Sequence, residues 1–171
     1  MPTVPFPDHS YDAALCQMGL QFFADKSAAL RELRRVLAPD GRLVVNVPGP
    51  TPRIFAILEQ APRDHLTPGT ANFVSTVFSL DDPRELTRLL DDAGFQDTSV
   101  RIGRKSLRLE PPAEFLWQYV SSTPLAAAAA GLDEHKRASL ERDVAGQWEG
   151  FTNGSALFLE LDVITATARR R

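Results

Sequence analysis

Polar and aromatic side chains that could hold a ligand follow a short apolar run near the start of the sequence. The run ending at Cys16 leads into Gln17, Met18, Gln21 and Phe22. Glutamine amides donate and accept hydrogen bonds, so they can bind a cofactor or substrate, or orient the helix that follows. Phe22 can wall an apolar cleft or pack in the core. Cys16 has no basic neighbour to lower its pKa, so we interpret it as a small buried apolar residue rather than a nucleophile.

A second group of candidate residues lies further along the sequence. Asn46 and Pro48 come at the end of a β-branched run, and His65 follows in an irregular stretch. Because histidine titrates near neutral pH, His65 is the best general-base candidate, although a single loop histidine is more often simply solvated. Trp117 lies on a predicted helix, where it either selects a substrate or packs in the core. The residue pattern assigns no catalytic residue, and no metal-binding motif is present.

The elements that must position these residues form a strand–helix–strand unit. Residues 13–16 are an uninterrupted apolar run, which is typical of a strand buried on both faces. A helix capped by Asp25 or Ser27 follows and stops at a Pro-Asp-Gly turn. Residues 43–47 predict the second strand, and the crossover between the two is expected to be right-handed. The candidate residues after the first strand therefore fall at its carboxyl end, where ligands bind to open parallel sheets.

The remaining segments predict an α/β fold in one domain. The expected elements are a helix over residues 53–60, an irregular stretch over 61–78, a helix after Asp82, a strand over 98–102, a helical insertion or lid over 105–150, and a long alternating strand over 157–164. No internal repeat or linker divides the sequence. Residues 1–171 are therefore expected to form a single domain.

Composition excludes several classes of function. The 171 residues carry a formal net charge of −3, which argues against general binding to nucleic acid. A single cysteine excludes an internal disulfide and a multi-cysteine zinc site, and it fits a reducing cytoplasm. No signal peptide and no apolar run long enough to span a membrane is recognisable, so we expect a cytoplasmic protein. The basic tail 169–171 is interpreted as a solvated end of the chain.

Several segments carry a family resemblance. Residues 5–8 (PFPD), 11–12 (YD), 15–23 (LCQMGLQFF) and 29–41 (ALRELRRVLAPDG) resemble the middle of class I S-adenosylmethionine-dependent methyltransferases of the type 11 group. This family usually has a Pro-Gly-Gly turn at this position. In the present sequence, Asp40 takes the place of the first glycine. Residues 86–95 are similar to a late family helix ending in Ala-Gly-Phe, and the closing strand is similar to the last family strand.

The resemblance implies a fold, a cofactor and a set of site residues. The fold would be a partial Rossmann-like sheet with family strands four to seven, flanked by helices, with the last strand antiparallel. The reaction would be direct methyl transfer from S-adenosylmethionine to a small-molecule acceptor that the sequence does not identify. The cofactor would contact Cys16, Gln17, Met18, Gln21 and Phe22, and the acceptor would approach Asn46, Pro48, His65 and Trp117.

The glycine-rich turn that holds the cofactor in this family is missing from the sequence. No Gly-x-Gly occurs among the ten glycines. The first three family strands would need about 60–100 residues, and they are expected upstream of Met1. We therefore interpret the sequence as an N-terminally truncated methyltransferase without the usual cofactor cradle.

Two alternative interpretations stay open at this point. The chain could be a non-catalytic methyltransferase-like remnant that acts as a binding or dimerisation module, or a partner chain could supply the missing half of the sheet. In each case the strand at residues 13–16 would lie at an exposed apolar edge. Exposed edges of this kind pair with other strands, so we expect poor solubility or self-association through that edge.

Overall fold

The computed structural model describes residues 4–60 and 68–171, and these form two compact units. The first unit comprises the residues up to Pro50 together with Phe78–Arg104 and Asp162–Arg171. The second comprises Thr51–Val77 and Lys105–Leu161. Each unit is described separately below.

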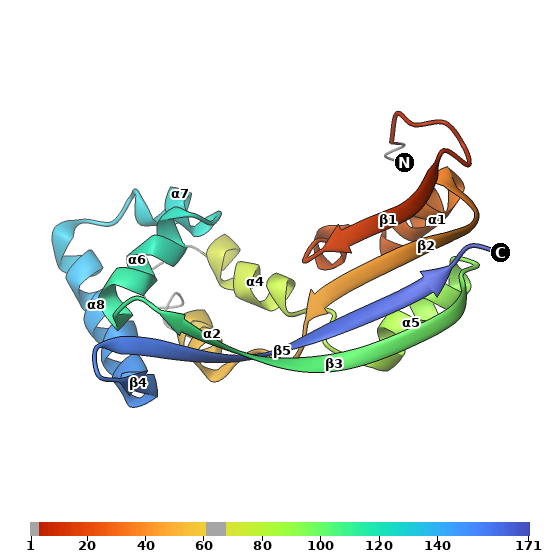
Figure 1. Ribbon diagram of the computed structural model, residues 1–171. Coiled ribbons are helices and arrows are strands. Elements are labelled where there is room, and N and C mark those ends of the chain that lie inside the picture. The colour runs from red at the N-terminus through yellow and green to blue at the C-terminus, as the bar shows by residue number, and fades with distance from the viewer. Residues whose placement is uncertain (1–3, 61–67) are drawn as a thin grey trace. The chain divides into compact units, whose positions relative to one another are not determined.

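One mixed sheet runs through the structure, and its four long strands are the ones that the sequence predicts (Figure 1). They are β1 (Tyr11–Gln17), β2 (Leu37–Pro48), β3 (Gln96–Leu109) and β5 (Ala156–Arg169), in the spatial order β1-β2-β5-β3. β1 is parallel to β2, and β5 is antiparallel to β2. The predicted α/β fold and the antiparallel last strand are therefore confirmed. The short strand β4 (Thr152–Asn153) pairs with the start of β5.

Two capped helices pack on one face of the sheet in the first unit. α1 (Lys26–Val36) begins at Asp25, whose carboxylate accepts a hydrogen bond from the Ala28 amide at 2.7 Å. α5 (Pro83–Asp92) begins at Asp82 with a proline in its first turn, and the chain leaves it through Gly94, which has a φ of 86°. The apolar stripes of both helices join one core cluster with the inward side chains of the strands, which are Leu43, Val45, Val47, Ile164, Ala166 and Ala168.

The opposite face of the sheet is much more exposed within the first unit. Leu15, Val44 and Thr167 lie in one row across β1, β2 and β5. The Leu15 side chain is 77% exposed, Val44 is half-buried and Thr167 is exposed. In the neighbouring row, Val45 is completely buried. Parallel strand pairs are normally covered on both faces, so the first unit leaves β1 and β2 with one face uncovered by its own described residues.

The second unit is built mainly from helices around a buried tryptophan. Its helices are α2 (Arg53–Gln60), α4 (Pro68–Val77), α6 (Pro112–Ser121), α7 (Leu125–Ala129) and α8 (Glu134–Trp148). Trp148 is completely buried, and its indole nitrogen donates a hydrogen bond to the Ile54 carbonyl oxygen at 2.9 Å. The Phe115 ring lies 5.7 Å from the Trp148 ring between centroids. The hydrogen bond and the ring contact of Trp148 together link α2, α6 and α8 in one core.

Three element boundaries differ from the sequence-based prediction. β2 starts at Leu37 and includes the predicted turn, where Asp40 adopts a φ of 61°. β3 continues to Leu109, into the stretch predicted to be helical, because it is hydrogen-bonded along the equally long β5. Within the stretch predicted to be irregular, residues 68–77 form α4, whose Val74 side chain is buried. In each case long-range packing overrides the local pattern.

The basic end of the chain is fixed to the structure, so its interpretation as a solvated tail is wrong. The Arg170 guanidinium donates hydrogen bonds to the carbonyl oxygens of Arg34, Arg35 and Leu37, at the end of α1. Arg171 donates to a carboxylate oxygen of Asp97 at 2.7 Å. A cation is favourable where the last carbonyl groups of a helix lack partners, so Arg170 caps α1 from a distant part of the chain.

We expect Arg170→Ala to lower the free energy of unfolding by about 1–3 kcal/mol, because the carbonyl groups at the end of α1 lose charged donors. Equilibrium unfolding in urea measures this change. Arg170→Lys is the matched control, because it keeps the charge but offers one ammonium in place of the planar guanidinium, and its loss should be smaller. Equal stability of the wild type and Arg170→Ala would contradict the capping role.

Candidate functional site

The carboxyl ends of β1 and β2 lie side by side in the first unit. Gln17 at the end of β1 is the register partner of Asn46 in β2. The next amide, that of Met18, donates to the backbone oxygen of Asn46 at 2.9 Å and also lies 3.1 Å from its side-chain oxygen. Met18 has a φ of 47°, a backbone conformation that residues other than glycine rarely adopt. The chain therefore leaves the sheet at Met18 through a fixed, sharp turn.

The residues after this turn present both buried and exposed side chains. Leu20 begins a short 3₁₀ helix, η1 (Leu20–Phe22), and is completely buried. Gln21 is only 3% exposed, and its amide oxygen has no hydrogen-bond partner among the described residues. A buried amide oxygen without a partner is costly, so a donor group that reached it would be stabilising. Phe22 and Phe23 are exposed to 50% and 41%.

Cys16 behaves as the sequence suggests. Its side chain is half-buried against the core cluster. Burial raises the pKa of the Cys16 thiol, with hydrogen bonds from the backbone of Gly19 and Leu20 acting in the opposite direction. A thiol with a raised pKa is a poor nucleophile at neutral pH, so Cys16 contributes apolar surface beside the turn.

A charged pair on β3 and β5, next to the end of β2, was missed by the sequence-based selection. Pro48 is buried, and the Gly49 amide donates to the Asp162 carbonyl oxygen at 2.7 Å. A side chain at Gly49 would meet the Asp162 Cβ at 3.0 Å, so glycine allows this close approach. Two nitrogens of Arg104 donate to the Asp162 carboxylate at 2.9 and 3.1 Å. These hydrogen bonds lower the pKa of Asp162, so the carboxylate is ionised and engaged rather than available as a base. The one sequence signal for this pair was an aspartate inside an apolar strand.

Part of this chain is similar to known methyltransferases. Residues 1–45, which include β1, the turn and α1, match the family model described as a methyltransferase domain. A structure of a candidate methyltransferase from Bacillus halodurans has the same fold over 98% of this chain and 73% of its own, with a TM-score of 0.57 at 15% identity. The YcgJ protein of Bacillus subtilis matches over 99% of this chain and 68% of its own, with a TM-score of 0.52 at 17% identity.

Residues 1–45 are similar to a methyltransferase domain, and the chain is similar in fold to a solved methyltransferase candidate. Among curated proteins, the demethylmenaquinone methyltransferase of Deinococcus radiodurans is 31% identical over 105 residues, which cover 54% of this chain and 44% of the relative. The protein of the same name from Thermus thermophilus is 40% identical over 76 residues, covering 44% of this chain and 34% of the relative. The chain thus spans less than half the length of these two relatives.

The structure brings together only part of the predicted site. The residues from Cys16 to Phe22 lie together with Asn46 and Pro48 in the first unit. His65 lies outside the described residues. Trp117 belongs to the second unit, where its indole nitrogen donates to Glu141 at 2.6 Å and the Arg137 guanidinium lies 4.2 Å from the ring centroid. Both the indole NH and a ring face of Trp117 are therefore engaged by neighbours within its own unit.

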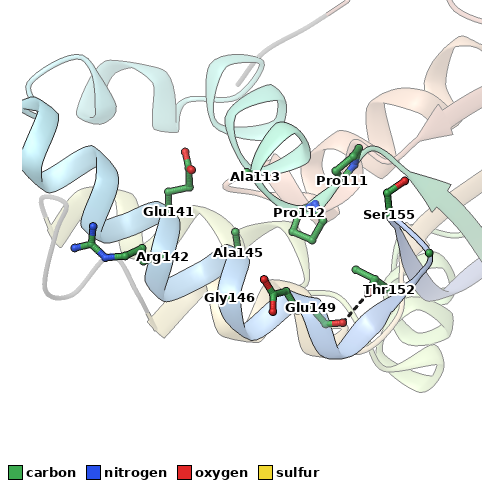
Figure 2. A pocket seen from close by; sticks show the side chains of 11 residues that line it. Pro111, Pro112, Ala113, Glu141, Arg142, Ala145, Gly146, Glu149, Thr152 and Ser155 are labelled. Carbon is green, nitrogen blue, oxygen red and sulfur yellow. Dashed lines mark hydrogen bonds between the residues drawn. The ribbon is translucent and has the colours of Figure 1, made fainter.

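A pocket in the second unit has a volume of about 790 Å³ (Figure 2). Figure 2 shows α8 along one side, with the first residues of α6 and the turn before β5 on the other. Thr152 donates from its hydroxyl to the Glu149 carbonyl oxygen at 2.8 Å. The charged residues of the pocket are Glu141, Arg142 and Glu149. None of the site residues predicted from the sequence lines it.

Neither a metal site nor a membrane span is found in the part of the chain that the structure describes. Residues 4–60 and 68–171 contain no group of three histidine, cysteine, aspartate or glutamate side chains placed to hold a metal ion. The helices in these ranges lack the length and apolar content needed to cross a bilayer.

Proposed function

We propose that this chain carries one wall of the ligand site of an S-adenosylmethionine-dependent methyltransferase. The observation that carries the proposal is the buried, unpartnered amide oxygen of Gln21, which follows the turn at Met18. It lies beyond the carboxyl ends of two parallel strands, where open α/β sheets bind their ligands. The matched family segment contributes β1, the turn and α1 to this position.

Each residue of the wall has a role in this proposal. Gln21 accepts a hydrogen bond from a donor group of the cofactor, and the exposed amide of Gln17 offers a second polar contact. Met18, Cys16 and Phe22 supply the apolar surface that excludes water from one side of the ligand. S-adenosylmethionine supplies an electrophilic methyl group when it is bound. The wall residues align cofactor and acceptor, S-adenosylhomocysteine is the leaving group, and the proton that a carbon acceptor loses goes to a base outside the wall.

The proposed acceptor is a small molecule of the quinone class. Two curated relatives are named demethylmenaquinone methyltransferases, and a 42-residue match at 52% identity links the chain to a ubiquinone and menaquinone C-methyltransferase of Hahella chejuensis. A ring carbon is then the methylated atom. Pro48 lies on the acceptor side in this proposal, and the assignments of Asn46, His65 and Trp117 to that side stay predictions.

Calorimetric titration of the purified chain with S-adenosylhomocysteine tests the proposal. We expect a Kd of about 1–100 µM, typical of a partly open small-molecule site. Gln21→Leu should weaken binding about tenfold, because the ligand donor loses its acceptor. The same substitution should not lower the free energy of unfolding, since it removes a buried polar atom that has no protein partner.

Gln96→Leu is the matched control, because it replaces an exposed glutamine at the start of β3 in the same unit. It should leave the affinity for S-adenosylhomocysteine unchanged. Absence of binding by a folded wild-type chain would contradict the proposed cofactor site. Equal affinity of the wild type and Gln21→Leu for S-adenosylhomocysteine would instead show that Gln21 does not belong to the cofactor site.

We also propose that the chain self-associates through β1, which is an edge strand in the described sheet. Large apolar side chains lie exposed on or next to this strand, namely Phe6, Tyr11, Leu15, Phe22 and Phe23. An apolar edge with unpaired backbone groups favours pairing with another strand. This surface is also what favours the second candidate function, a methyltransferase-like module that mediates dimerisation without catalysis.

A further inference from the structure

Asn46 makes a contact that its position in the sheet does not require. Continuation of the parallel ladder needs only the backbone oxygen of Asn46, which accepts from the Met18 amide at 2.9 Å. The side-chain oxygen of the same residue is a second acceptor for that amide, at 3.1 Å. Asn46 is half-buried in β2, in one row with Gln17 on β1 and Thr165 on β5. Two oxygens of one residue therefore converge on a single amide.

That amide belongs to a residue with a left-handed backbone conformation. Met18 has a φ of 47°, and a left-handed conformation of a residue with a long side chain is about 1–2 kcal/mol less favourable than a right-handed one. Such a conformation persists only when surrounding contacts determine it. The additional acceptor on Asn46 is a contact of this kind, since together with the backbone oxygen it fixes the peptide plane from which the turn at Met18 starts.

The turn decides where the proposed ligand-binding residues lie. Gly19 follows it directly, and a side chain there would come within 3.4 Å of the Cys16 sulfur, so the turn is tightly folded back on β1. Leu20 then anchors η1 in the core with no exposed surface. Gln21 follows with its unpartnered amide oxygen. A change in the Met18 backbone would move Gln21 and Phe22 together, because η1 is a single short helix.

We propose that Asn46 is a positioning residue, which acts through the Met18 turn and does not contact the ligand. This inference rests on the proposed function and assigns to Asn46 a role other than contact with the acceptor. It predicts that the hydrogen-bond acceptor at position 46 matters, whereas the amide NH₂ group does not. Asn46→Asp keeps the acceptor, and Asn46→Leu replaces the side chain by an apolar one of similar size.

The first measurement is hydrogen exchange of the Met18 amide by NMR. We expect exchange in Asn46→Leu to be about tenfold faster than in the wild type, and exchange in Asn46→Asp to stay within about threefold, because only the leucine lacks the second acceptor. Thr165→Val is the matched control. It alters the β5 neighbour of Asn46 in the same row without removing an acceptor from Met18, and it should exchange like the wild type.

The second measurement is calorimetric titration of the same variants with S-adenosylhomocysteine. Asn46→Leu should bind about tenfold more weakly, whereas Asn46→Asp and Thr165→Val should bind like the wild type. A loss of affinity in Asn46→Asp equal to that in Asn46→Leu, with Met18 still protected, would make Asn46 a direct ligand contact and overturn the proposal. Unchanged protection of Met18 in Asn46→Leu would overturn it as well. If the wild type does not bind S-adenosylhomocysteine, the proposed function fails, while the exchange measurement still decides the role of Asn46 in the turn.

Discussion

Trp148→Ala should lower the free energy of unfolding by about 3–5 kcal/mol, the largest stability effect that we expect from a single substitution in the second unit. Trp148 is completely buried between helices, and its ring lies against Phe115. Truncation leaves a large cavity and removes the hydrogen bond that links α8 to the Ile54 carbonyl group. Urea unfolding followed by circular dichroism gives the difference in the free energy of unfolding between the two proteins.

Trp148→Phe separates the two contributions of this residue. Phenylalanine retains most of the apolar contact but cannot donate to the Ile54 carbonyl oxygen, so a smaller loss of about 1–3 kcal/mol is expected. The other tryptophan, Trp117, offers a matched substitution. Trp117→Phe removes a half-buried indole that donates to Glu141, and its effect should be below that of Trp148→Ala. A loss of less than about 1 kcal/mol in Trp148→Ala would show that α2, α6 and α8 do not depend on this side chain.

Leu15→Lys should convert a self-associating chain into a monomer, with a rise of at least about a hundredfold in the dissociation constant. The Leu15 side chain is 77% exposed on β1, so the substitution alters no buried contact of the single chain. An introduced lysine on an edge strand opposes pairing, because the partner strand would have to desolvate its charge. Analytical ultracentrifugation over a range of protein concentrations measures the change.

Leu107→Lys is the control for this prediction. Leu107 is 42% exposed on β3, at the opposite edge of the sheet. Leu107→Lys therefore also replaces an exposed leucine by lysine. It should leave self-association unchanged if β1 forms the interface. Equal effects of both substitutions would indicate unspecific apolar attraction. A wild-type chain that is monomeric at every concentration would exclude the dimerisation function.

Local sequence patterns predicted much of the fold because they act over a few residues. Asp25 and Asp82 each accept a hydrogen bond from an amide in the first turn of their helix, as cap preferences suggest. The apolar run at residues 13–16 and the β-branched run at 43–47 form parallel strands, as predicted. The grouping of residues 16–22 with Asn46 follows from that parallel arrangement, since both lie at carboxyl ends.

Contacts between distant parts of the sequence could not be predicted in this way. Arg104 and Asp162 are 58 residues apart, and neither has a local pattern that points to the other. Arg170 reaches carbonyl groups 133–136 residues earlier in the chain, so the basic tail resembled an ordinary solvated end. The second acceptor on Asn46 also depends on register, because Met18 and Asn46 become neighbours only when β1 pairs with β2.

The order of strands in the sheet has a consequence for synthesis on the ribosome. β5 is the last of the long strands to be made, yet it lies between β2 and β3. Until β5 has left the ribosome, the nascent chain contains two separated parts of a sheet, each with an open inner edge. Contacts over long sequence separations form slowly, and open edges invite pairing with other chains. The yield of folded protein should therefore depend on chaperones that shield β2 and β3 while translation finishes.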